Sequence, residues 1–145
     1  MVNRAYLYWT PTQRLGLRAE YQYEDLVRDP RLVSNGFDYI ALRTQRVPIG
    51  MSWFDPSGIT LTTTATFTDQ SGKFLDTLTN RGSSGQDDFW LVDAQLSYRL
   101  PRRYGLVSVG VRNLFDRHFR FHEPDPTNPT VYPERFLYMK LELSF

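Results

Sequence analysis

The sequence contains no cysteine, no long apolar run and no excess of one charge. Without cysteine the chain forms no disulfide bond and offers no thiolate to a metal. Cysteine content therefore does not indicate whether the protein resides in an oxidising or a reducing compartment. Its 17 basic and 16 acidic residues are interleaved and give a net charge of +1, so no broad basic face indicates a nucleic-acid partner. No apolar stretch approaches the roughly 20 residues of a membrane-spanning helix, although a membrane-spanning strand needs only about 9–11 residues, every second one apolar.

The usual signatures of catalysis are also missing. The sequence has no nucleophile–base spacing, no phosphate-cradling glycine loop and no Ser/His/Asp arrangement. We therefore expect that the protein is not an enzyme and uses no cofactor. The opening MVNRAYLYWT lacks the regions of a signal peptide, so an exported chain would carry its signal upstream of Met1.

Alternating apolar and polar residues, typical of a β-strand with one apolar face, recur along the chain, whereas helical spacing is scarce. They mark the stretches 15–24, 59–68, 90–100, 107–121 and 137–145. Two further strands are predicted at 3–9 and 47–54, with 37–46 as an extension of the second. Proline cannot donate to a strand ladder, so we expect Pro48 to mark a strand start or a bulge.

The two faces of these strands differ consistently. One face carries apolar residues, such as Leu15, Leu17 and Ala19. The other carries charges of both signs: Arg18, Glu20, Glu24, Asp93, Arg99, Arg112, Asp116, Arg120, Lys140 and Glu142. Such a mixed wall is expected if water or a polar plug fills a barrel, and it indicates no preference for anions or cations.

The connections between the predicted strands alternate in length. Short turns at 10–14, 55–58 and 101–105 carry the proline, glycine and aspartate typical of tight turns. The other connections, at 26–36, 69–88 and 122–135, are long. Outer-membrane barrels have short periplasmic turns and long extracellular loops. Aromatic residues make up 15% of the chain and cluster near strand ends, as in the girdles of such barrels.

The predicted fold class is therefore all-β: an antiparallel up-and-down transmembrane β-barrel meander of about seven strands. A complete bacterial barrel has an even strand count, and unpaired strand edges are not tolerated in lipid. We therefore expect residues 1–145 to be the C-terminal part of a larger outer-membrane β-barrel domain, which lacks its plug and N-terminal strands. In this interpretation Phe145 is the true C-terminus.

One motif supports a family resemblance. The stretch VGVRNLFDRHF contains Asn113, Leu114, Phe115 and Asp116, and after a proline-rich loop Glu134 and Arg135 open a last strand that closes on Phe145. This arrangement resembles the C-terminal barrel strands of TonB-dependent outer-membrane receptors. The stretches YWTPTQRLGLRAEYQYE and DFWLVDAQLSYRLPRRYG look like the family's strand–turn–strand units.

The resemblance implies a location in the outer membrane of a Gram-negative bacterium and a role in nutrient uptake, for example of a metal–siderophore complex. The implied partners are outer-membrane lipid, the barrel-assembly machinery, an unknown small-molecule ligand, and the TonB complex, which is reached through N-terminal regions that this sequence lacks. The closing Leu141, Leu143 and Phe145 resemble the signal read by the assembly machinery, although the glycine common in that signal is not present.

Other interpretations stay open at this point. A passive or secretion-type porin would show the same barrel chemistry. A soluble β-sandwich binding module would bury the apolar row beneath a second sheet. An outer-membrane enzyme of the lipase kind would need an outward-facing Ser–His pair at one rim, and none is evident.

Several polar residues are candidates for a metal or ligand site. His118 and His122 are separated by roughly 13 Å on a strand, too far for one metal ion, and the acidic residues between 69 and 88 match no calcium-loop spacing. No metal site is predicted, and the long loops are expected to contribute to ligand capture. Asn113 interrupts the apolar row, so it marks either a bulge or a position near the outer rim.

Overall fold

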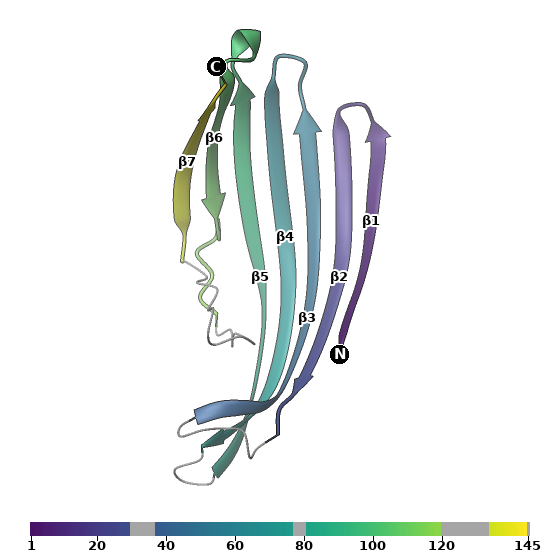
Figure 1. Ribbon diagram of the computed structural model, residues 1–145, viewed down its shortest axis with the longest axis vertical. Coiled ribbons are helices and arrows are strands. Elements are labelled where there is room, and N and C mark those ends of the chain that lie inside the picture. The colour runs from purple at the N-terminus through teal and green to yellow at the C-terminus, as the bar shows by residue number, and fades with distance from the viewer. Residues whose placement is uncertain (30–36, 77–80, 120–133, 145) are drawn as a thin grey trace.

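Seven strands, each hydrogen-bonded to its neighbours in sequence, form one open antiparallel sheet (Figure 1). The computed structural model describes residues 1–29, 37–76, 81–119 and 134–144. The strands are β1 (Val2–Thr12), β2 (Leu15–Val27), β3 (Phe37–Phe54), β4 (Ile59–Asp76), β5 (Arg81–Arg99), β6 (Gly105–Arg112) and β7 (Phe136–Leu143). A short 3-10 turn, η2 (Pro101–Arg103), joins β5 to β6. The prediction of an all-β, up-and-down antiparallel meander is confirmed.

The three short connections lie where the sequence predicts them, together at one end of the sheet (Figure 1). The turn between β3 and β4 shows why its residues suit it. The Gly58 N–H donates to the Asp55 carbonyl at 2.9 Å, and the Ser57 N–H donates to the Asp55 carboxylate at 2.9 Å. Gly58 adopts a φ of 93°, which only glycine reaches without steric cost.

The prediction of a long loop at 69–88 is wrong. β4 and β5 stay paired from Asp69↔Asp88 to Asp76↔Arg81, so this part of the chain is a long hairpin. Backbone hydrogen bonds continue here although most residues on both faces are polar or glycine, with the buried Phe74 as an exception, and hydropathy alternation cannot reveal such an extension. The expected extension of the third strand over 37–46 is confirmed, because β3 begins at Phe37.

Pro48 is also placed differently from the prediction. It lies inside β3, paired with Thr66 of β4, and marks neither a strand start nor a bulge. On the other side of β3 the ladder has no pairs for Glu20 and Tyr21, opposite Pro48 and Val47. The missing proline N–H therefore interrupts only the ladder with β2, and the register resumes unchanged beyond the gap.

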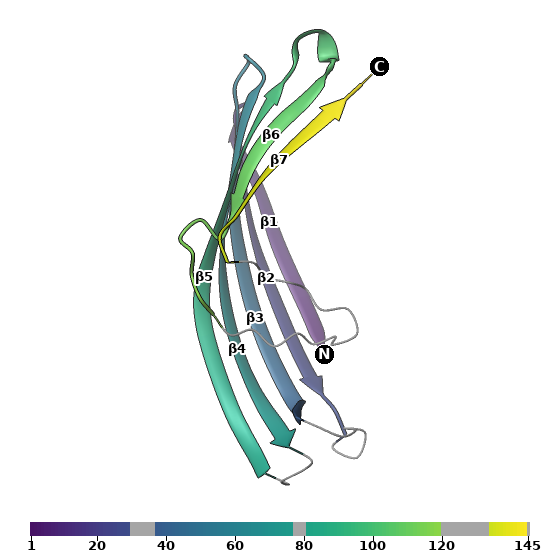
Figure 2. The same ribbon diagram turned by 90° about the vertical axis from the view of Figure 1, so that its left-hand side faces the viewer.

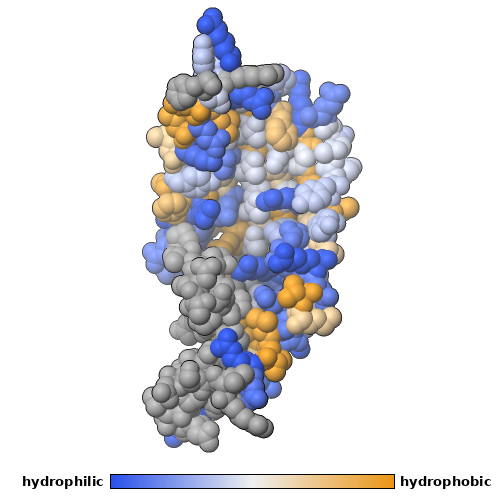
Figure 3. All heavy atoms as spheres, in the orientation of Figure 1, coloured by the Kyte–Doolittle hydropathy of each residue, from blue (hydrophilic) through white to orange (hydrophobic). Residues whose placement is uncertain are grey.

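The apolar face and the polar face are defined by this register. The apolar face comprises Leu7, Trp9, Leu17, Ile49, Met51, Trp53, Phe67, Trp90, Leu96, Tyr98, Val109, Leu137, Met139, Leu141 and Leu143 and the residues between them on the same parity. The polar face carries the alternate residues, and Figure 3 looks onto it: hydrophilic residues gather over the middle strands. Figure 2 shows that the strands bow along their length, and the face seen in Figure 3 is on the concave side of this bow.

The first strand, whose faces the sequence left unassigned, follows the same rule. Leu7 and Trp9 pair with Ala19 and Leu17 and therefore join the apolar face. Tyr6 and Tyr8 lie on the polar face, with ring centroids 6.0 Å apart.

The buried core is small. Among the described residues the buried hydrophobic side chains are Leu42, Phe74 and Phe89, and Leu26 packs against the first two. No described residue forms a second layer over the apolar face of the sheet, and most of the large apolar side chains on that face are exposed.

Long side chains cross glycines on the polar face. Tyr138 of β7 passes over Gly110 of β6, and its hydroxyl donates to Gln95 Oε1 on β5 at 2.8 Å. Arg18 of β2 likewise passes over Gly50 of β3 and donates to Thr64 Oγ1 of β4 at 3.0 Å. In both cases the glycine leaves the space that lets a side chain reach the next strand but one.

We predict that Gly110→Ala destabilises the sheet by about 1–3 kcal/mol, because the new Cβ overlaps the Tyr138 ring and displaces its hydroxyl from Gln95. The matched control is Gly16→Ala, whose Cβ would meet only the Ser52 carbonyl oxygen, at 3.9 Å, and which should change stability by less than about 0.5 kcal/mol. Urea unfolding followed by tryptophan fluorescence measures both, and equal effects would contradict the crossing role of Tyr138.

We also predict an acid-sensitive turn at Asp55. Hydrogen bonds from the Ser57 hydroxyl and then from the Ser57 N–H lower the pKa of Asp55 from its ordinary value of 3.8. A lowered folded-state pKa stabilises the fold above the ordinary pKa, and this contribution is lost as the pH falls through the folded value. The unfolding midpoint of Asp55→Asn, measured against pH, should therefore decline less than that of the wild type below about pH 4. Superimposable pH curves would show that the carboxylate adds nothing to the turn.

Candidate functional site

The most unusual surface of the molecule is the exposed apolar face. Leu96, Val109 and Met139, from three neighbouring strands, retain 53%, 50% and 75% of their accessible surface. They lie side by side, because Leu96 pairs with Val109 and Val109 with Met139. Monomeric soluble proteins rarely expose contiguous apolar patches beyond a few hundred Å², so a surface that spans the whole sheet marks a site of interaction.

The apolar face ends at a common level on neighbouring strands, towards the end away from the short connections. Phe67 and Trp90 are paired there, with ring centroids 5.3 Å apart. The next residues of the same parity, Asp69 and Asp88, face each other across the same two strands. In register the polar row beyond this level runs through Tyr23, Gln45, Asp69 and Asp88. The apolar surface is therefore a band that stops abruptly within continuous strands.

Aromatic residues mark the other border of the band, near the short connections. Trp9 lies level with Met51, and Trp53 stands two residues further along β3. Trp53 is in turn level with Leu96, and Tyr98 stands two residues further along β5. From one aromatic residue to the next, the position moves about 6.6 Å (two residues) along the strands and about 9.6 Å (two strand spacings) across the sheet. The line through these aromatic residues is therefore inclined by about 35° to the perpendicular of the strands. Strands in outer-membrane barrels tilt by about 35–45°.

The candidate assembly residues lie on the last strand. Leu141 and Leu143 are on the apolar face of β7 and are 59% and 52% exposed. β7 pairs with β6 on one side and, within the described part of the chain, has no neighbour on the other. Phe145 lies outside the described residues. The position of the two leucines is that of an exposed edge strand, which is accessible to a further strand.

The candidate family motif Asn113–Leu114–Phe115–Asp116 forms a turn directly after β6. Asn113, only 3% exposed, takes a φ of 49°, and its side-chain amide both accepts from the Arg117 N–H at 2.8 Å and donates to the Arg117 carbonyl at 3.0 Å. The Asn113 N–H donates to Asp93 Oδ1 at 2.9 Å, and the Leu114 N–H donates to the Val92 carbonyl at 2.8 Å. Asn113 thus lies past the strand end and is not a bulge.

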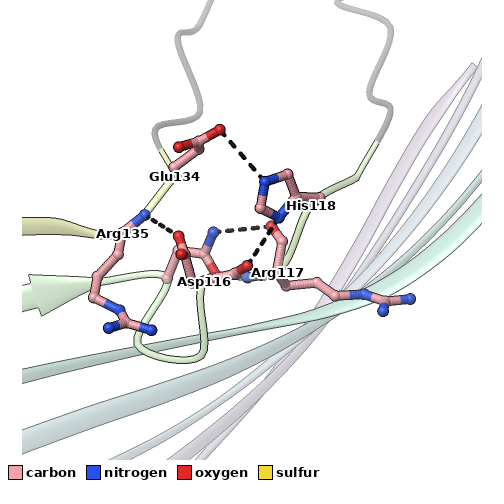
Figure 4. Close-up of polar contacts among 6 residues, drawn as sticks. Asp116, Arg117, His118, Glu134 and Arg135 are labelled. Atoms are coloured by element: carbon pink, nitrogen blue, oxygen red, sulfur yellow. Dashed lines mark hydrogen bonds and ion pairs between the residues drawn. The ribbon is translucent and has the colours of Figure 1, made fainter.

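This turn also holds the two ends of the following connection together (Figure 4). Asp116 accepts a hydrogen bond from the Arg135 N–H at 2.8 Å, and His118 Nε2 lies 3.5 Å from Glu134 Oε1. The prediction that residues 107–121 continue one strand is therefore wrong, because the chain folds back at Asn113 to satisfy its buried amide. His122, Glu123 and Phe121 lie outside the described residues.

Phe119 corrects a second prediction. The sequence placed it in the apolar row, but its ring stacks on Phe89 of the polar face at 4.2 Å between centroids and 21° between planes. Phe89 is 4% exposed, so the pair forms a fixed apolar floor within an otherwise polar surface. The reversal of the chain at Asn113 brings the ring to this face.

A cavity of about 600 Å³ adjoins this floor. Its described lining residues come from β4, from β5 and from the segment after β6: Gln70, Gly72, Gly85, Gln86, Asp87, His118 and Phe119. Gln70 is buried and donates to Thr44 Oγ1 at 3.0 Å. The Gln86 side chain points to the opposite face of the sheet, where it donates to Asp69 Oδ1 at 3.2 Å. The cavity lies in the part of the polar face furthest from the short connections.

Sequence reasoning missed a polar network near the C-terminal edge. Tyr138 donates to Gln95, Gln95 Nε2 donates to Ser97 Oγ at 2.9 Å, and the Ser97 and Ser108 hydroxyls are 2.9 Å apart. Arg112 lies 6.0 Å from the Tyr138 ring centroid. Gly110, an isolated glycine inside a strand pattern, was the available signal, because such a glycine often marks a close approach.

No helix within residues 1–29, 37–76, 81–119 and 134–144 has the length and apolar character to cross a membrane. The same ranges bring together no group of three or more His, Cys, Asp or Glu side chains suited to a metal ion. In comparisons with known proteins, no family model, curated protein or solved structure matches the chain.

We predict that Asn113→Gly, which keeps the positive φ but removes both side-chain hydrogen bonds, destabilises the protein by about 1–3 kcal/mol. Asn113→Ala should cost about 1 kcal/mol more, because alanine tolerates the positive φ poorly. Chemical unfolding measures both variants against Phe115→Ala, a control in the same turn whose ring is 71% exposed. An Asn113→Gly variant as stable as the wild type would refute the clamp.

Proposed function

We propose that this chain is a wall segment of an outer-membrane β-barrel, whose apolar face contacts lipid and whose polar face lines the lumen. The intact protein would be a receptor of the TonB-dependent kind that takes up a nutrient, such as a metal–siderophore complex. The observation that carries the proposal is the apolar band, with an inclined aromatic border on one side and an abrupt polar row on the other.

The band matches a bilayer in height. On β4 it runs from Ile59 to Phe67, and on β5 from Trp90 to Tyr98, close to the about 9–11 residues that a tilted transmembrane strand needs. The aromatic border is inclined by about 35°, which is within the tilt of membrane barrels, whereas the opposite border, between Phe67–Trp90 and Asp69–Asp88, runs perpendicular to the strands. In water the exposed side chains would gain nothing from this arrangement, whereas in lipid they contact hydrocarbon.

The polar face supports the assignment of the lumen. It combines charges of both signs with hydroxyls and amides, such as Arg18, Thr64 and Gln95, on the concave side of the sheet. The competing hypothesis of a soluble sandwich needs a second sheet over the apolar face. All strands in the described ranges belong to one sheet, which leaves that face uncovered.

The free edges support a larger barrel. Among the described strands, β1 and β7 each pair on one side only, and they run in the same direction (Figure 1). Lipid does not tolerate unpaired backbone groups, so further strands would have to complete the ring in a membrane. The resemblance of Asn113–Asp116 and the last strand to TonB-dependent receptors is the ground on which we propose a receptor, and a passive or secretion-type porin would share these residues. The clamp around Asn113 gives that motif a physical role.

The proposal is tested by two neighbouring residues of β4 that point to opposite faces. Ala65→Arg places a charge near the middle of the apolar band and should cost about 2–4 kcal/mol in lipid, whereas Thr66→Arg on the polar face should cost about 0–1 kcal/mol. The measurement is the free energy of unfolding after insertion into phospholipid vesicles.

Two results would contradict the proposal. One is an equal cost for the two substitutions, which would mean that the faces do not differ in environment. The other is a monodisperse, cooperatively unfolding chain in buffer without detergent, which would mean that the apolar band needs no lipid.

A further inference from the structure

We propose that a pocket between the β3–β4 turn and the β5–β6 connection binds a small carboxylate ligand with an apolar body. The two connections lie next to each other at the end of the sheet where the short connections gather (Figure 1). The pocket has a volume of about 450 Å³, which is within the roughly 300–1,000 Å³ of small-molecule sites. Its lining combines two arginines, one carboxylate and several apolar side chains.

The strand residues that line the pocket all point to the polar face of the sheet. Phe54 pairs with Thr60 across the β3–β4 hairpin, and Arg99 of β5 pairs with Leu106 of β6. All four alternate along their strands with residues of the apolar face. Their side chains therefore lie on one surface, and residues of the two connections close the pocket at the end of the sheet.

The cations of the pocket are Arg99 and Arg102. The Arg99 N–H donates to the Gly58 carbonyl at 2.9 Å, which holds the end of β5 against the β3–β4 turn. A Cβ on Gly58 would lie 3.3 Å from the Arg99 Cβ, so the glycine leaves room for the arginine side chain. Arg102 belongs to η2 and has a φ of 55°. This conformation is costly for a residue with a Cβ, and such residues cluster at ligand clamps.

Neither arginine forms an ion pair with a carboxylate among the described residues. The nearby carboxylates have other partners. Asp55 accepts a hydrogen bond from the Ser57 N–H at 2.9 Å, and hydrogen bonds from Ser57, with a smaller contribution from the charge of Arg14, lower the pKa of its carboxyl. Glu142, on the strand next to β6, forms a salt bridge with Lys140. Two guanidinium groups therefore line one pocket without an internal anion, and each offers a planar fork of donors that fits a carboxylate.

Apolar side chains complete the wall. Phe54 is 47% exposed although it lies on the polar face, and Pro56, Leu100 and Leu106 also line the pocket. A small inorganic anion would leave these side chains in water, whereas an aromatic or aliphatic body would remove them from water. The pocket therefore suits a ligand that is apolar at one end and anionic at the other.

The charge of the lining favours a monoanion. Arg99 and Arg102 outweigh Asp55, so the lining carries one net positive charge. A carboxylate balances this charge, whereas the second negative charge of a phosphate monoester would have only the Asp55 carboxylate left to face. A cationic ligand would meet two like charges, and a neutral one would leave both guanidinium groups without an anion.

The test is a fluorine NMR titration of 4-fluorophenylacetate with the full chain, in buffer or in detergent micelles, whichever keeps the chain folded, and with the same medium without protein as the blank. The competing probes are phenylacetate, its amide phenylacetamide, the cationic phenethylamine, acetate and phenyl phosphate. We expect phenylacetate to displace the fluorinated probe at an about tenfold lower concentration than any other competitor, equivalent to roughly 1.4 kcal/mol.

Matched variants make the result specific. Arg99→Gln and Arg102→Gly should each weaken the binding of the fluorinated probe about tenfold. Glycine suits the φ of 55° at position 102, so Arg102→Gly should keep the turn and unfold at the same urea concentration as the wild type. Arg43→Gln removes one cation from a side chain that is 57% exposed and does not line the pocket, so it should leave the affinity unchanged.

Three results would overturn the proposal. The first is binding of the fluorinated probe no greater than in the blank. The second is a competitor other than phenylacetate that displaces the probe equally well, which would show that the charge or the apolar wall is not used. The third is a folded Arg102→Gly variant with the affinity of the wild type.

The inference goes beyond the proposed function and does not rest on it, because two connections of the sheet form the pocket whatever lies against the apolar face. A chain that is stable in plain buffer and binds phenylacetate through Arg102 overturns only the membrane barrel. A chain that requires lipid and distinguishes Ala65→Arg from Thr66→Arg, yet binds no carboxylate probe, overturns only the pocket.

Discussion

Backbone pairing between neighbouring strands is the constraint on which the rest of this structure depends. The sheet has almost no buried core to hold it together: Leu42, Phe74 and Phe89 are the buried hydrophobic residues in the described ranges. Its order comes from continuous ladders such as that of β4 with β5, which keeps one register from Ile59 to Asp76. Because side chains alternate, a slip of one residue would mix the two faces and destroy the apolar band.

The exposed apolar face makes the stability of the fold depend on what lies against that face. In an ordinary globular domain the hydrophobic effect stabilises the fold by removing side chains such as Leu96 and Met139 from water. Here the same residues stay on the surface after folding. A medium or partner on that side would supply this stabilisation, and this is the physical reason for our proposal that the apolar face contacts lipid.

Much of the fold was predictable because period-2 alternation and turn chemistry are local. Residues 15–24 and 59–68 alternate strictly, and the DPSG turn contains the aspartate, proline and glycine that its geometry uses. The extended β4–β5 hairpin was not predictable from hydropathy, because its residues do not alternate between apolar and polar and Phe74 is the one buried hydrophobic residue described there. Pro48 was misplaced because its effect depends on which neighbour its missing N–H faces.

The site was predicted less well, since its parts meet only in three dimensions. Asn113 and Asp116 could be picked out as a motif, but the hydrogen bonds to Arg117, Asp93 and Arg135 depend on a reversal that alternation does not reveal. The same reversal brings Phe119 to the polar face, where periodicity had placed it on the other. The cavity combines residues far apart in sequence, and no local pattern joins Gln70 to Phe119.

The glycines under Tyr138 and Arg18 help to select the native alignment of neighbouring strands. Backbone ladders and face patterns both repeat every two residues, so neither can distinguish the native alignment from one shifted by two. Moving β7 by that amount would set Tyr138 against Ser108 or Arg112, whose side chains fill the gap that Gly110 leaves. Moving β2 in the same way would set Arg18 against Ser52 or Pro48 in place of Gly50. The space above each glycine therefore distinguishes the native strand alignment from alignments shifted by two residues, which hydrogen bonds and hydropathy alone do not distinguish.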